Sequence, residues 1–286
     1  MTDFSDDWLA LRAPADGRAR ADELLEPLLA NWPMPRQVLD LAAGTGANLR
    51  HLAPRLGEDQ YWVCVDHDPA LLARLPSRTA DWAAAAGHDC ECDGSALRCC
   101  GDGWSCRIET QRLDLVAQLG SLEMPAGGLV TASALLDLVS ADWLEGLLTR
   151  AADAGCRLLF ALSYDGRCRL EPSLPDDHDV IALVNRHQRG DKGFGPALGP
   201  DAADIAASIS RKLGYRVRTS PSDWQIGPDE PTLQRALLDG WTQAALDTAP
   251  DAAATIRTWR QMREQAICAG RLRITVGHVD LAARSE

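Results

Sequence analysis

A short glycine-rich segment, Val38–Asn48, holds the residues whose types and spacing most clearly suggest ligand binding. Its sequence is VLDLAAGTGAN, so that Asp40 stands just ahead of Gly44 and Gly46. The two glycines allow a tight turn and let a ligand approach the backbone closely. In open α/β sheets such a loop lies at the carboxyl end of a strand, where ligands bind. We therefore predict a binding loop between a buried strand and a helix.

Two further acids follow later apolar runs. Asp66 ends the second run, 20 residues beyond Gly46, and a carboxylate at this position can accept hydrogen bonds from both hydroxyls of an adenosine ribose. Asp114 comes just after the third run, where it could receive an adenine amino group. Each acid alone could be a strand-end turn former. All three together with the glycine loop favour a ligand that contains adenosine.

The same loop distinguishes between two adenosine ligands. The dinucleotide fingerprint G-x-G-x-x-G would need a third glycine where this chain has Leu49. Asp40 would also repel a pyrophosphate, whereas the α-ammonium group of a sulfonium ligand would be attracted to it. The pattern therefore favours S-adenosylmethionine over a nicotinamide cofactor.

On these residues the chain resembles the class I S-adenosylmethionine-dependent methyltransferases, over about residues 36–163. Val38–Asn48 looks like their motif I, with Ala42 in place of the usual first glycine, and Asp66 and Asp114 resemble the later acidic motifs. His67 resembles the position that packs on the adenine ring. The resemblance implies a doubly wound, mostly parallel seven-stranded Rossmann-like α/β sheet whose last two strands are antiparallel. The cofactor-binding residues that we expect from it are Asp40, Ala42, Gly44, Gly46, Asp66, His67, Asp114, Leu115 and Ser133.

The acceptor is less well defined by sequence. The segment after the fourth expected strand lacks an Asn/Asp-Pro-Pro-aromatic motif and offers Ser133 and Asp137 instead. A net charge of −12 and a pI of about 4.9 disfavour a nucleic-acid substrate. We expect a methyltransferase that acts on a small-molecule acceptor. The alternative is a catalytically silent module that binds the cofactor and regulates or scaffolds a partner.

The densest polar segment, Asn185–Gly195, follows the fifth expected strand. We predict that it forms a wall of the acceptor site, with His187 as general base because of its intrinsic pKa. Asp191 could orient this base, and Lys192 or Arg189 could hold an acidic substrate. Tyr164, with its neighbour Asp165, is a further candidate for the pocket lining. The competing interpretation of His187 is an ordinary surface histidine.

Five of the nine cysteines crowd between Cys90 and Cys106 with the spacing C-x-C-x6-C-C-x5-C. This spacing differs from the paired C-x-x-C knuckles that hold tetrahedral zinc. The chain shows no secretory signal. We therefore expect free thiols and no metal, within a loop or irregular hairpin over residues 87–103.

Alternating apolar runs and helical patterns supply the scaffold. We expect strands at 37–41, 61–65, 107–113, 128–133, 158–163, 215–218 and 271–281. Helices are expected over 8–31 (kinked or divided at Pro27), from Pro69, from near Ser140, over 180–187 and 201–213, and within 230–268. We interpret residues 1–286 as one methyltransferase domain. It comprises an N-terminal helical cap (1–35), a cofactor-binding core (36–163), and a substrate-side loop, helical insertion and last two strands (164–286). No apolar run is long enough for a membrane span, so we expect a cytoplasmic protein.

Overall fold

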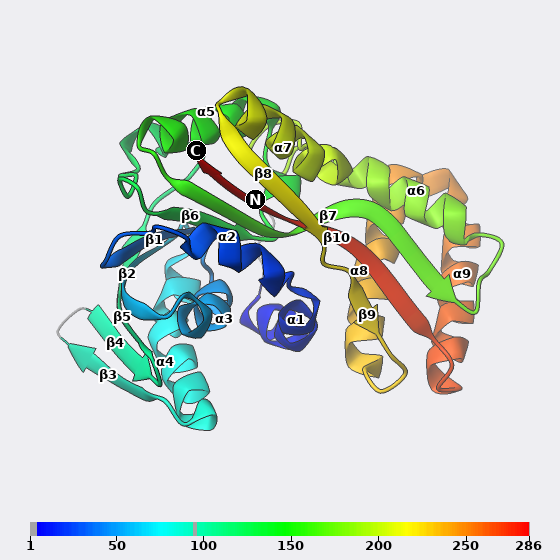
Figure 1. Cartoon of the computed structure of the whole chain (residues 1–286). Coiled ribbons are helices and arrows are strands. Elements are labelled where there is room, and N and C mark those ends of the chain that lie inside the picture. The colour runs from blue at the N-terminus through cyan, green and yellow to red at the C-terminus, as the bar shows by residue number, and fades with distance from the viewer. Residues whose placement is uncertain (1–4, 94–95, 286) are drawn as a thin grey trace.

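The computed structural model describes residues 5–93 and 96–285, in which ten strands form one mixed sheet with helices on both faces (Figure 1). The strand order is β3-β4-β5-β2-β1-β6-β7-β10-β8, and β9 pairs with β10. The strands are β1 (Arg36–Leu41), β2 (Glu58–Asp66), β3 (Asp89–Asp93), β4 (Ala96–Gly101), β5 (Trp104–Arg112), β6 (Leu129–Ser133), β7 (Arg157–Glu171), β8 (Tyr215–Pro221), β9 (Trp224–Ile226) and β10 (Arg273–Ser285).

Strands β5, β2, β1, β6 and β7 run parallel to one another, whereas β4 is antiparallel to β5, and β10 runs antiparallel to both β7 and β8. This confirms the expected doubly wound sheet with an antiparallel last pair. The count differs because β3, β4 and β9 extend the seven-stranded core. Chain neighbours in β1 face opposite sides, so Val38 and Leu39 belong to different hydrophobic cores.

The helices cover both faces and one end of the sheet. They are α1 (Asp6–Ala19), α2 (Leu25–Leu29), α3 (Ala47–Leu56), α4 (Pro69–Ala86), α5 (Ala141–Asp153), α6 (Asp177–Gln188), α7 (Ala202–Lys212), α8 (Pro231–Thr248) and α9 (Ala253–Cys268). Short 3-10 segments lie at Asp22–Leu24, Leu119–Ser121, Leu136–Leu138, Gly199–Asp201 and Pro250–Ala252. Helices α5 and α7 pack on one face and α2 and α3 on the other. In the described part of the chain no helix is long and apolar enough to cross a membrane.

Local signals fix the helix starts beside the site. Asp68 caps α4 by accepting the Ala70 backbone N–H at 2.7 Å, and Pro69 occupies the first turn. Ser140 caps α5 by accepting the Trp143 N–H at 3.3 Å, which confirms the predicted start. Both helices therefore begin where the sequence signals put them.

The N-terminal region departs from the prediction. The chain leaves helical geometry at Arg20 rather than at Pro27, which lies inside α2. Arg20 turns inward, where its guanidinium donates to Asn48 Oδ1 at 2.8 Å and lies 3.8 Å from Asp280 Oδ2. This buried network separates α1 from α2. Because it depends on residues far apart in the chain, the position of Pro27 in the sequence could not predict it.

Residues 87–103 are more regular than a loop, because β3 and β4 form an antiparallel hairpin that extends the sheet beyond β5. Within it Cys90 lies directly opposite Cys99, and the two are joined by a disulfide. The expectation of free thiols is therefore wrong for this pair, because strand register brings together two cysteines nine positions apart in the chain. Cys92, Cys100 and Cys106 are free.

Strands β7 and β10 run on together beyond the core, as the long green and red ribbons of Figure 1 show. Helices α6, α8 and α9 pack along this extension and bury a third hydrophobic core. A fully buried Arg263 on α9 fixes the insertion by pairing with Asp177 at the start of α6 and donating to the Pro172 carbonyl at 2.7 Å. Both terminal nitrogens of this buried guanidinium thus find acceptors, one of them a carboxylate, although its Nε has no partner among the described residues.

Candidate cofactor and acceptor site

The glycine loop turns sharply between β1 and α3, and Asp66 holds it in place. Asp66 Oδ2 accepts the Gly44 backbone N–H at 2.8 Å, and Oδ1 accepts that of Asp68 at 2.9 Å. Gly44 and Gly46 have φ of +54° and +82°, and Ala42 has φ of +51°. These left-handed conformations favour glycine. The expected need for glycine is thus confirmed at two positions, and Ala42 adopts the same region with a methyl group.

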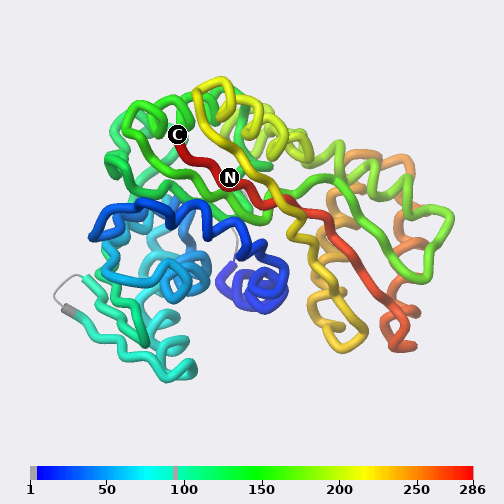
Figure 2. Tube along the Cα trace, viewed as in Figure 1, coloured from blue at the N-terminus to red at the C-terminus, as the bar shows by residue number. Residues whose placement is uncertain are grey.

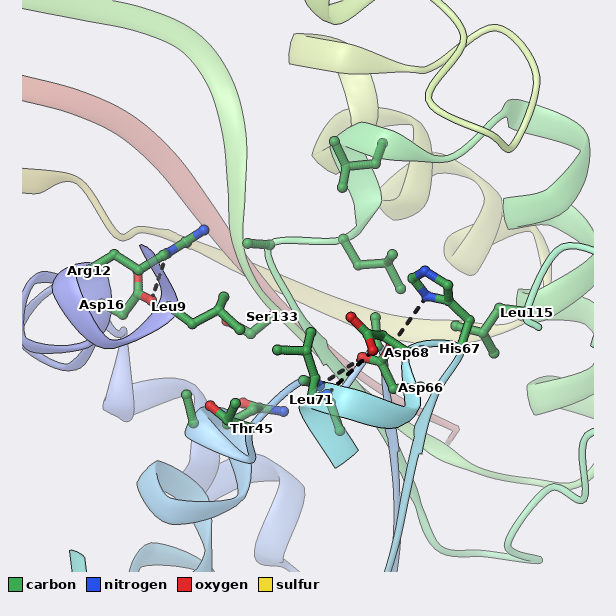
Figure 3. Close-up of a pocket in the computed structure, with 18 of the residues that line it drawn as sticks. Leu9, Arg12, Asp16, Thr45, Asp66, His67, Asp68, Leu71, Leu115 and Ser133 are labelled. Atoms are coloured by element: carbon green, nitrogen blue, oxygen red, sulfur yellow. Dashed lines mark hydrogen bonds and ion pairs between the residues drawn. The ribbon is translucent and has the colours of Figure 1, made fainter. Parts of the chain in front are cut away.

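A cleft opens at the carboxyl ends of β1, β2 and β6, above this loop. Among the predicted cofactor residues, six line the cleft; they are Ala42, Gly44, Asp66, His67, Leu115 and Ser133. Arg12 and Asp16 lie toward one end, and His67 and Leu115 lie toward the other, with Asp66 between them (Figure 3). The cleft is thus elongated, with acidic groups along its floor.

Asp40 is placed differently from the prediction. It is fully buried and does not line the cleft, because Asn48 covers it and donates from Nδ2 to Asp40 Oδ1 at 2.7 Å. Burial raises the pKa of Asp40 to about 7, although the hydrogen bond from Asn48 opposes this shift. Its other oxygen has no hydrogen-bond partner among the described residues. Asn48, at the start of α3, is therefore the polar group that meets the cleft here.

Gly46 and Asp114 also lie outside the cleft lining. Gly46 is the N-cap of α3, and a Cβ there would lie 3.0 Å from Leu75 Cγ, so its role is to let the loop pack on α4. Asp114 accepts the Val116 backbone N–H at 2.9 Å, as a turn former does. Its neighbour Leu115 faces the cleft in its place.

The three residues predicted to act in catalysis do not line the cleft. His187 lies near the end of α6, with Nδ1 3.2 Å from Lys192 Nζ. The Asp191 carboxylate accepts the backbone N–H groups of Gly193 and Gly195 at 2.7 and 3.0 Å and so shapes its own loop. Tyr164 is buried with its hydroxyl on Asn185 Oδ1 at 2.7 Å, and burial raises its pKa. This arrangement gives no support to His187 as the base or to Asp191 as its partner.

Part of the predicted acceptor wall does reach the cleft. Lys192 and Phe194, from the segment Asn185–Gly195, belong to its lining together with Leu135 and Leu138. Arg189 points elsewhere, to Asp201 at 2.9 Å. Of the two cations that the sequence analysis left open, Lys192 lines the cleft and Arg189 does not.

Helix α1 supplies residues to the cleft that the sequence analysis did not assign. Leu9, Arg12 and Asp16 line it, and the Arg12 guanidinium binds Asp16 in a bidentate pair at 2.9 and 3.0 Å. Trp224 Nε1 donates to Asp16 Oδ1 at 3.1 Å, which ties α1 to β9. The spacing i, i+3, i+7 places the three residues on one face of a helix, and this is the signal that could have found them.

The loop is closely fitted to α1. A Cβ built on Gly44 would lie 3.3 Å from Leu9 Cδ1. A side chain at position 44 would therefore crowd Leu9 of α1. Figure 2 shows α1, in dark blue, tucked beside α3 on the side toward β9. Helix α1, within the segment 1–35 that we interpreted as an N-terminal helical cap, thus forms a roof over one end of the cleft.

No protein-family model and no curated protein matches the chain. Among solved structures it is similar to an S-adenosylmethionine-dependent methyltransferase from Geobacter sulfurreducens in complex with S-adenosylhomocysteine, at 14% identity over 100% of both chains and a TM-score of 0.44. A cyclopropane synthase from Mycobacterium tuberculosis is similar at 13% identity, with 98% and 94% of the chains covered and a TM-score of 0.47.

A third similar structure is phosphoethanolamine N-methyltransferase 2 from Haemonchus contortus in complex with S-adenosylmethionine, at 13% identity and a TM-score of 0.44. All of this chain is covered, but only 58% of that protein. Identities this low do not transfer an acceptor from these enzymes to this chain.

The topology itself decides the fold. Its core order is β5-β2-β1-β6-β7-β10-β8. The mostly parallel sheet with an antiparallel last pair, β8 and β10, is what the resemblance of Val38–Asn48 implies. The chain has the class I methyltransferase fold. The cleft in this fold is lined by the Asp66 carboxylate, by Leu115 near His67, and by Gly44, which leaves room for close approach to the backbone. In the described ranges 5–93 and 96–285, no group of His, Cys, Asp and Glu side chains is arranged to hold a metal ion.

Proposed function

We propose that this protein is an S-adenosylmethionine-dependent methyltransferase that acts on a small-molecule acceptor. The observation that carries the proposal is the 2.8 Å hydrogen bond from Gly44 N to Asp66 Oδ2, because it locks the close-approach turn and places the carboxylate on the cleft floor. Asp66 keeps lone pairs free to accept the ribose hydroxyls. A methyl group on a sulfonium is the chemistry that the bound cofactor would supply.

The cleft residues suggest an orientation. His67 and Leu115 at one end suit the adenine ring, with Asp66 next to them for the ribose. The amino-acid arm then extends toward α1, where Asp16 and Arg12 offer one charge of each sign. Asp16 can bind the α-ammonium group of the cofactor, and Arg12 can bind its α-carboxylate. Asp40, which we expected to attract the α-ammonium group, is buried away from the cleft.

The chain's own residues contribute mainly positioning. In-line methyl transfer depends on holding acceptor and methyl group in contact and on keeping water away. Helix α1 covers one end of the cleft, and the loop that carries Lys192 and Phe194 forms another part of its wall. Ser133 is the last residue of β6 and Leu135 comes two residues later; both line the cleft, at the point where an acceptor would meet the cofactor.

Isothermal titration calorimetry tests the cofactor assignment. We expect S-adenosylhomocysteine to bind in the micromolar range and NAD not to bind. Asp66→Ala should weaken binding by about 1.5–3 kcal/mol through loss of charged hydrogen bonds. Asp59→Ala is the matched control, because Asp59 is an exposed carboxylate near the opposite end of the same strand. Binding of NAD but not of S-adenosylhomocysteine would refute the proposal.

A further inference from the structure

Lys192 is a cation in the cleft wall without an acidic partner. Its ammonium group contacts His187 Nδ1 at 3.2 Å, and within the described residues it forms no ion pair. Partial burial lowers its pKa, while the more distant carboxylates of Asp137 and Asp247 act in the opposite direction. A half-buried ammonium group in a ligand cleft usually has an oxyanion as its partner.

His187 acts on Lys192 as a hydrogen-bond acceptor. An ammonium group can only donate, so Nδ1 of a neutral imidazole must accept. Burial and the Lys192 charge both lower the pKa of His187, which favours this neutral form. On the other side of the ring, Nε2 lies 3.9 Å from Asp247 Oδ2. His187 is therefore a positioning residue for Lys192.

The segment that carries Lys192 is held by its own turn and by contacts with Val139 and Trp143, at the start of α5. Asp191 closes it through the two backbone N–H groups of Gly193 and Gly195, and Leu198 N donates to the Val139 carbonyl at 2.8 Å. Phe194 packs edge-on against Trp143, with ring centroids 5.1 Å apart. Lys192 and Phe194 thus present a fixed cation and a fixed aromatic surface to the cleft.

The remaining lining near this cation is apolar. It consists of Ala134, Leu135 and Leu138 after β6, together with Phe194. The charge of Arg12 is already matched by Asp16 within the cleft. Lys192 is therefore the cleft cation that remains for a ligand, beside a surface that suits a ring or short hydrocarbon.

We propose that Lys192 binds an oxyanion of the acceptor, a carboxylate or a phosphate, while Phe194 and Leu135 contact the acceptor's apolar body. The acceptor is thus a small acid. This inference rests on the proposed methyltransferase function, because it assigns the part of the cleft beyond the cofactor. In this proposal Lys192 determines specificity for the acceptor, and His187 positions the Lys192 ammonium group.

The test measures binding of matched probes to the protein saturated with S-adenosylhomocysteine. Benzoate, phenyl phosphate and benzamide share one ring and differ in charge, so their dissociation constants can be compared by ligand-observed NMR titration. We expect at least one anion to bind about tenfold more tightly than benzamide, as one charge-assisted hydrogen bond implies. The stronger of the two anions identifies the preferred oxyanion.

Variants locate the effect. Lys192→Met should abolish the preference for the anion, and His187→Leu should reduce it, whereas His187→Asn should retain it because the amide oxygen can still accept from Lys192. Arg189→Met is the matched control, because this exposed arginine pairs with Asp201 outside the cleft.

Two outcomes would overturn the inference: equal or absent binding of anions and benzamide, or an anion preference that survives in Lys192→Met. Binding of S-adenosylhomocysteine is measured in the same samples. If that ligand binds but no anion preference exists, only the acceptor assignment fails. If that ligand itself does not bind, the proposed function fails.

Discussion

Asp16→Asn would test whether α1 recognises the amino-acid arm of the cofactor. The substitution keeps the side-chain shape and an oxygen that can accept from Trp224 Nε1, now at 3.1 Å from Asp16 Oδ1. It removes the negative charge that faces the cleft at the end opposite His67. We therefore expect weaker binding of S-adenosylhomocysteine with little change in the fold.

The magnitude follows from the local charges. A hydrogen bond to a charged group contributes about 1.5–3 kcal/mol. The Asp16 side chain is 17% exposed and already shares its charge with Arg12 at 2.9 Å, so its effect should fall below the middle of that range. A loss of about 1–2 kcal/mol corresponds to a dissociation constant about 5–30 times higher.

Calorimetry with two ligands isolates this contribution. Methylthioadenosine lacks the amino-acid arm, so its affinity should be the same for Asp16→Asn and for the parent protein. The difference between the two ligands is a coupling energy of the kind that double-mutant cycles measure. Asp7→Asn is the matched control, since Asp7 is an exposed acid on the same helix.

An equal loss of affinity for both ligands would refute this reasoning. In that case Asp16 would act through the docking of α1 against Trp224, and the orientation proposed for the cofactor would lose its support at this end. An unchanged affinity for S-adenosylhomocysteine would have the same consequence.

Two further predictions concern the glycine loop and the strand below it. Ala42 has φ of +51°, so Ala42→Gly should raise the free energy of unfolding by about 0.5–1 kcal/mol. Gly44 has φ of +54°, and a Cβ built there would lie 3.3 Å from Leu9 Cδ1. Gly44→Ala should therefore lower the free energy of unfolding by about 1–2 kcal/mol. Urea denaturation checks both, and shifts of the same sign would contradict the assigned conformations. Burial raises the pKa of Asp40 to about 7, so the folded protein keeps a proton that the unfolded chain releases above its ordinary pKa. The stability of the parent protein relative to Asp40→Asn should therefore fall as the pH rises from about 4 to 7, by up to about 1.4 kcal/mol per pH unit; parallel stability curves for the two proteins would disprove the shift.

The sequence alone was sufficient for the features that local pattern controls. Gly44, Gly46 and the strand-end acid Asp66 predicted the binding loop and its position. The alternation of apolar runs with helical patterns predicted the order of the core elements along the chain. These features are encoded by residues close together in the chain, whose backbone preferences and periodicity act over a few positions. The Ser140 and Pro69 helix starts belong to the same class.

Side-chain direction at the site required the tertiary structure. Asp40 precedes the loop as expected, but Asn48 covers it, because β1 is buried on both faces and its polar groups must be satisfied from neighbouring elements. Arg189 and Lys192 were equivalent candidates in the sequence. In the folded chain the two lie on either side of the turn at Asp191: Arg189 pairs with Asp201, and Lys192 lines the cleft.

Partners that are distant in the chain were likewise decided only by folding. The roof over the cleft depends on a contact between Asp16 and Trp224, which are 208 residues apart. The Cys90–Cys99 disulfide depends on the register of β3 against β4. Contacts of this kind arise from the packing of whole elements, so a sequence read by local pattern gives the loop and its acids but not the residues that close over them.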